Sequence, residues 1–279
     1  MNGSLGFFTL QITLVAVVLV LHTYMGLHVI RRTIVFCDLV LDQLAAFGAL
    51  VGIGLGVAYA TPGSYLVSLA MVLLGSVLLA AINPRSRSIP REAVIGIMYA
   101  LALVASLLLG DKLSGGEAYV TKTLAGSMLW ATWTLVAVTA AVYVLLLLFH
   151  IRFRHRFVAL TERPDTLENQ KLWDFLFFAT QGIITVLIVP IAGVLLAYSF
   201  LMIPAAIAAM FSGGWIAAVA IGCGAGLVAC AMGIAASYSW DLPYGPTLVL
   251  SLGLFFLGAA VIRSLRPQSA SLARGGAER

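Results

Sequence analysis

Charged residues are scarce in this chain. Only 10% of its 279 residues are Asp, Glu, Lys or Arg, whereas 62% are hydrophobic, and the mean hydropathy is +1.06. A soluble domain of this length carries far more charge on its surface, so the composition excludes a soluble protein. The apolar residues form continuous runs and do not alternate with polar ones, which disfavours a β-barrel. We therefore predict an all-α, polytopic membrane protein embedded in a lipid bilayer.

Motifs for catalysis and nucleotide binding are missing as well. The sequence contains no GxxxxGK[ST] phosphate loop, no HExxH and no GxSxG. We expect no enzyme activity and no bound cofactor, and any ATP hydrolysis that drives this protein must occur in another polypeptide. Cys37, Cys223 and Cys230 lie in apolar stretches without CxxC spacing, which predicts buried thiols. The net charge of +5 comes from loop arginines, so we expect no nucleic-acid partner.

Apolar windows predict eight or nine membrane crossings. They cover residues 6–29, 33–59, 64–82, 93–110, 123–150, 172–189, 194–212, 215–236 and 247–265. The count depends on residues 190–193, which form either a tight turn or a kink. With nine crossings, every arginine-rich loop falls on one side of the membrane. The positive-inside rule then places the N-terminus outside and the C-terminus in the cytoplasm. Residues 1–265 are predicted to form one transmembrane domain, and 266–279 a polar tail.

Asp38 and Asp42 are acidic residues within an apolar stretch. They lie four residues apart, so a helix places them on one face. A charged side chain at the bilayer centre costs roughly 2.5–3.5 kcal/mol on insertion scales, so the pair needs a partner or a proton. Oxygen ligands suit Mn²⁺ or Fe²⁺, although zinc tolerates carboxylates. We predict that both line an ion path. The alternative is a structural pair close to the interface, because Arg32 is only six residues away.

The other polar residues within or near the apolar stretches are predicted to have structural roles. His22 lies towards the middle of the first helix, where a hydrogen bond to a neighbouring helix is expected more often than metal ligation. His28 is expected among the headgroups, and His150 and His155 in a basic loop. Asp174 begins a helix, where its charge would stabilise the helix dipole.

The segment 151–171 is the largest cytoplasmic loop in this topology. The spacing from Asp165 to Glu168 is that of a capping box and predicts a short helix just after Pro164. This loop is either a solvated connector or a docking element for a soluble partner. The predicted docking residues are Thr161, Glu162, Arg163, Asp165 and Glu168.

Five stretches, in the same order, resemble motifs of the permease subunit of bacterial ABC importers for zinc, manganese or iron. RRTIVFCD (31–38) resembles the arginine-led start of the helix that carries the family motif GDALSH, and REAVIG (91–96) resembles the family's REDAAIG. LAGSML (124–129) resembles LFGSIL. GVLL (193–196) and MIPAA (202–206) together resemble GVLLV…LLIPAATA, and LPYGPT (242–247) resembles LPSGPT. Together they extend across roughly residues 26–262.

The resemblance implies a homodimeric permease of the bacterial cytoplasmic (inner) membrane. It would bind a cytoplasmic ATPase subunit, receive a divalent metal from an extracytoplasmic metal-binding protein and pass it along a central path. Asp38 takes the place of the family's aspartate, Asp42 that of its histidine, and Cys37 that of its glycine. A carboxylate pair shifts the preference from zinc towards a harder ion. The family's DPEFAxxxG docking pattern is not visible in 159–171, which implies a matched ATPase.

Two other functions remain open. A secondary transporter would use the same aspartates as a proton or ion relay. In a membrane assembly protein that transports nothing, the carboxylates would be structural.

Overall fold

A computed structural model describes residues 2–82, 89–125 and 131–265, and this part of the chain is almost entirely helical. Its helices are α1 (Asn2–Arg31), α2 (Cys37–Gly54), α3 (Pro62–Ala81), α4 (Arg91–Lys112), α5 (Gly116–Ala125), α6 (Trp133–Arg152), α7 (Arg154–Glu162), the 3₁₀ turn η2 (Pro164–Thr166), α8 (Gln170–Ala192), α9 (Val194–Phe211), α10 (Trp215–Trp240) and α11 (Tyr244–Leu265). The predicted tail 266–279 lies outside the described residues, as does most of the 124–129 motif.

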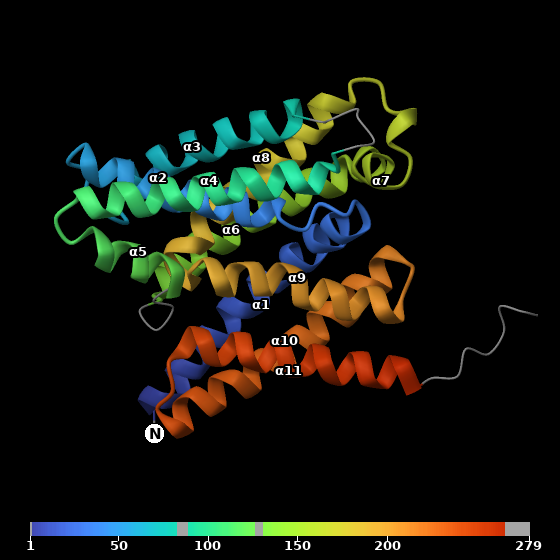
Figure 1. Cartoon of the computed structure of the whole chain (residues 1–279). Coiled ribbons are helices and arrows are strands. Elements are labelled where there is room, and N and C mark those ends of the chain that lie inside the picture. The colour runs from blue at the N-terminus through green and yellow to red at the C-terminus, as the bar shows by residue number, and fades with distance from the viewer. Residues whose placement is uncertain (1, 83–88, 126–130, 266–279) are drawn as a thin grey trace, which may run out of the picture.

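Among the described residues, nine helices are long and apolar enough to cross a membrane; α5 and α7 are the short exceptions. The N-terminus and the end of α11 lie at opposite ends of the bundle, as an odd number of crossings requires (Figure 1). Gly193 alone separates α8 from α9, with a φ of 78° that favours glycine. The chain therefore turns at this point. The all-α fold is confirmed, with nine candidate spans.

The bundle has a buried centre and an apolar outer surface. Helix α1 packs against α6, α9 and α10, while α8 packs against α2 and α3. Most of α8 is buried, whereas only 22% of α4, 22% of α6 and 17% of α11 are buried over their most apolar stretches. Because their exposed residues are largely apolar, the outer helices suit contact with lipid or with another membrane protein.

Two glycines allow close helix packing. A Cβ at Gly48 of α2 would lie 2.6 Å from Ser68 Cα of α3, and one at Gly222 of α10 would lie 2.7 Å from Pro204 O of α9. Small residues let helix backbones approach in this way.

The expected span 123–150 is wrong as one continuous helix. Residue 123 belongs to α5, which ends at Ala125, and α6 begins at Trp133. Thr132 caps α6 by accepting a hydrogen bond from Leu135 N at 3.3 Å. The apolar run obscured this boundary, since hydropathy does not distinguish a capped start from a continuing helix.

The loop 151–171 also differs from its prediction. The helix expected after Pro164 is only the 3₁₀ turn η2, and α8 begins at Gln170. The loop's α-helix is α7, which lies before Pro164 and packs Phe157 and Leu160 inward. Capping-box spacing indicated a helix start, but Pro164–Thr166 forms only a single turn.

Candidate translocation site

Asp38 and Asp42 lie in the first two turns of α2, and both are almost fully buried. Helix α8 lies alongside, and Gln181 Nε2 donates a hydrogen bond of 2.5 Å to Asp38 Oδ1. One turn further along α8, Thr185 is close enough to interact with Asp42. Neither carboxylate oxygen of Asp42, however, has a well-formed hydrogen bond from any described residue.

Tyr143 of α6 completes this group from a third helix. It is buried and close enough to Asp38 and Asp42 to interact with both charges. His22 of α1 stacks on its ring at a centroid separation of 5.7 Å. We call Asp38, Asp42, Tyr143 and Gln181 the carboxylate cluster.

Several oxygen atoms of the carboxylate cluster lack partners. Within the described residues these are both oxygens of Asp42, the hydroxyl of Tyr143 and Oε1 of Gln181. Buried polar atoms are nearly always hydrogen-bonded, so such a concentration calls for a functional explanation. The interior of the bundle therefore holds oxygen atoms that can coordinate a cation or form hydrogen bonds with water.

A third buried carboxylate, Asp174, lies near the start of α8. Arg32 Nη2 donates to Asp174 Oδ1, and Arg91 Nη2 lies 3.6 Å from Asp174 Oδ2. We call Arg32, Arg91 and Asp174 the Asp174 triad. It joins the α1–α2 turn to the first turn of α4 and to α8. Burial lowers the pKa of Arg32, and Asp174 opposes this effect.

The triad corrects one prediction and bears on another. Asp174 lies beyond the first turn of α8 and is held by two arginines, so the dipole explanation is wrong. Arg32 pairs with Asp174, and the described residues give Asp38 no arginine partner. Gln181 lies about 10 Å further along α8 than Asp174, from the helical rise of 1.5 Å per residue. Asp38 is therefore separated from the triad by about two helical turns.

Two histidines are buried inside the protein. His28 lies in the last turn of α1, with Nδ1 2.6 Å from Thr161 Oγ1. His150 lies in the last turn of α6, with Nε2 2.9 Å from Thr180 Oγ1. The expected position of His150 in a loop is therefore wrong, whereas the level of His28 among the headgroups stays a prediction.

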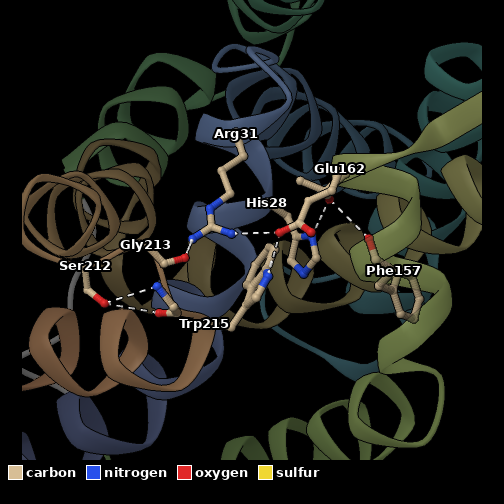
Figure 2. A network of polar contacts seen from close by, with 9 residues as sticks. His28, Arg31, Phe157, Glu162, Ser212, Gly213 and Trp215 are labelled. Carbon is tan, nitrogen blue, oxygen red and sulfur yellow. Dashed lines mark hydrogen bonds and ion pairs between the residues drawn. The ribbon is translucent and has the colours of Figure 1, made fainter. Parts of the chain in front are cut away.

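Helix α7 is connected to α1 and α10 by polar contacts (Figure 2). Glu162 Oε1 accepts hydrogen bonds from Arg31 Nη1 at 3.1 Å and from Trp215 Nε1 at 2.9 Å. Arg31 also donates to Gly213 O at 2.7 Å, and its guanidinium carbon lies 4.1 Å from the centroid of the Trp215 ring. Together with the His28–Thr161 contact, these bonds fix the C-terminal end of α7 to two membrane-spanning helices.

The predicted docking residues thus fall into two groups. Thr161 and Glu162 contact α1 and α10, whereas no such contact holds Arg163, Asp165 and Glu168. The last three side chains are exposed, and Glu162 is also partly exposed, with a side-chain exposure of 45%.

Sequence reasoning missed Gln181 and Tyr143. Gln181 had a signal, since it is an amide within the apolar window 172–189. Tyr143 had none, because tyrosine occurs throughout such helices.

Comparison with known proteins agrees with this architecture. The family model described as "ABC 3 transport family" matches residues 7–263. An uncharacterized membrane protein of Synechocystis sp. is 29% identical over 230 residues, or 78% of each chain. A "Probable metal transport system membrane protein" of Chlamydia pneumoniae is 25% identical over 178 residues, which span 62% of this chain and 60% of that protein.

The fold also matches a solved structure, PsaBC from Streptococcus pneumoniae in complex with Fab. The TM-score is 0.77 at 18% identity, covering 96% of this chain and 95% of the other. Because the family model extends over nearly all of the membrane-spanning region, this chain belongs to the ABC 3 transport family.

Proposed function

We propose that this chain is the permease subunit of an ATP-driven importer and forms the path for a divalent transition metal: manganese, iron or zinc. The observation that carries the proposal is the carboxylate cluster, in which both oxygens of Asp42, the hydroxyl of Tyr143 and Oε1 of Gln181 lack a well-formed hydrogen bond from the described residues. Family membership supports transport, and the name of the Chlamydia relative supports a metal as the substrate.

The donor chemistry favours a hard or borderline ion. Mn²⁺ and Fe²⁺ are better suited to carboxylate, amide and phenol oxygens than to ligand sets rich in nitrogen and sulfur. Among the described residues, no group of three or more His, Cys, Asp or Glu side chains could hold a metal. Two carboxylates therefore make a weak site, as transit requires, because an ion that bound tightly would leave slowly. Water, Tyr143, Gln181 or a second copy of the chain would supply the remaining ligands.

The triad and α7 indicate how the cytoplasmic side is organised. Arg31, Arg32, Arg91 and Arg154 all lie at one end of the bundle, where α7 and the Asp174 triad are found. The positive-inside rule assigns this end to the cytoplasm and the N-terminus to the outside. A separate ATPase subunit would bind the exposed side of α7 and η2, and an extracytoplasmic metal-binding protein would deliver the ion at the opposite end.

The test is metal uptake by proteoliposomes that contain this chain and its ATPase subunit, with ATP enclosed on the side where the ATPase lies. We expect Asp38→Asn and Asp42→Asn each to remove nearly all uptake of radioactive Mn²⁺ while the complex still assembles. Asp111→Asn is the matched control, because Asp111 is exposed at the end of α4.

Uptake that survives both substitutions would remove the carboxylates from the path. Uptake by the chain alone, driven by a pH gradient without ATP, would contradict the permease function and favour a secondary transporter.

A further inference from the structure

A hollow of about 1000 Å³ lies between α6 and α10, and residues of α1 line it as well. Its floor is formed by Val20 and Tyr24 of α1, and its walls by Leu147 and Ile151 of α6 and by Ile216 and Val219 of α10. We call it the α6–α10 groove. The proposed transport path does not use it, since none of the residues of the carboxylate cluster lines it.

The groove is apolar along its walls and basic at one end. At that end lie Arg154 and His155 of α7 and Arg163, which directly follows α7. The acidic residue there, Glu162, is already engaged by Arg31 and Trp215 (Figure 2). Unlike Glu162, Arg154 and Arg163 form no ion pair with any described carboxylate. An occupant would therefore meet apolar walls and then excess positive charge.

We propose that the α6–α10 groove binds an anionic phospholipid, with its acyl chains against α6 and α10 and its phosphate at Arg154 and Arg163. The position of the charge supports this occupant. Arg154 and Arg163 lie at the end of the bundle where the arginine-rich turns gather, which is the level of lipid headgroups. Basic side chains beside the membrane attract anionic headgroups, and arginine binds phosphate in a bidentate manner.

A second copy of the chain fits the groove less well. In a two-fold dimer whose axis runs along the membrane normal, each residue meets partner residues at the same depth. The basic end of one groove would then approach the basic end of the other, and like charges at an interface are unfavourable. Exposed apolar faces on α4 and α11 offer a second copy a surface without this charge.

Lipid binding is measured on the purified full chain in detergent, independently of transport. Native mass spectrometry with phosphatidylglycerol or phosphatidylcholine should show preferential retention of phosphatidylglycerol. We expect Arg154→Gln and Arg163→Gln each to weaken this binding about fivefold, from roughly 1 kcal/mol per basic residue near an anionic surface. Arg156→Gln is the matched control, because Arg156 is exposed on α7 but does not line the groove.

Trp215 provides a second, local measurement, since it lines the groove. Phosphatidylglycerol with brominated acyl chains should quench tryptophan fluorescence, and Trp215→Phe should remove part of that quenching.

Equal retention of both lipids, or equal loss in Arg156→Gln, would overturn the proposal. So would a disulfide between two copies carrying Ile216→Cys that wild-type protein does not form, because the groove would then be an interface between copies.

Discussion

The Asp174 triad and the carboxylate cluster both contain buried carboxylates, on α8 itself in the triad and on the neighbouring α2 in the cluster. The surroundings of these carboxylates differ. Asp174 is contacted by two arginines, whereas Asp42 has only Thr185 close by and no well-formed hydrogen bond to either oxygen among the described residues. A buried charge with partners holds helices together, and one without partners is costly unless a ligand or a proton satisfies it. The contrast supports the proposal that the cluster serves the substrate, while the triad holds helices together.

The largest effect on stability should come from the triad. Asp174→Asn leaves Arg32 and Arg91 buried near each other without a countercharge, so we expect the free energy of unfolding to fall by about 3 kcal/mol. Thermal unfolding in detergent measures this change. Asp42→Asn is the comparison, and it should leave the stability unchanged or raise it. If both variants lost the same stability, the distinction between the two regions would be wrong.

Coupling between α7 and the bundle should show the next largest effect. Glu162→Gln removes the charge that holds Arg31 while keeping a side chain of similar size. We expect ATP hydrolysis by the assembled complex to persist while the metal transported per ATP falls about fivefold, which corresponds to the ~1 kcal/mol of a partly exposed ion pair. Asp111→Asn, at the exposed end of α4, is the control. A parallel loss of hydrolysis and uptake would instead indicate a defect in docking.

The smallest of the expected effects is a change in metal preference. Asp42→His introduces a nitrogen ligand, removes one carboxylate and recreates the aspartate–histidine spacing of the resembled motif. We expect the preference for zinc over manganese to rise several-fold, because imidazole suits zinc and carboxylate suits manganese. Competition between the two ions during uptake measures the ratio. An unchanged ratio would show that position 42 does not select the ion.

Much of the membrane topology was predictable because hydropathy is a local property. The windows identified the spans, and the arginine pattern favoured nine crossings over eight. The same method failed at residues 131 and 132, which lie outside any helix just before α6, since an apolar run does not reveal where a helix begins. It also missed α7, whose sequence is too polar to register as a span.

The candidate site was predictable only in part. The four-residue spacing of Asp38 and Asp42 placed them on one helix face, and the structure shows both of them buried there. Tyr143 and Gln181 come from helices more than 100 residues further along the chain, so no local pattern connects them to α2. Asp174 was assigned to a helix dipole because its arginine partners are likewise distant in sequence.

By itself, the sequence determined that this chain is a helical membrane protein with two carboxylates on one face of a helix, because hydrophobicity and helical periodicity act over neighbouring residues. The tertiary structure decided which buried charges have partners: Asp174 receives two arginines, and Asp42 receives none among the described residues. That outcome depends on how α2, α4, α6 and α8 rotate and pack against one another. Those rotations are set by contacts along the whole bundle.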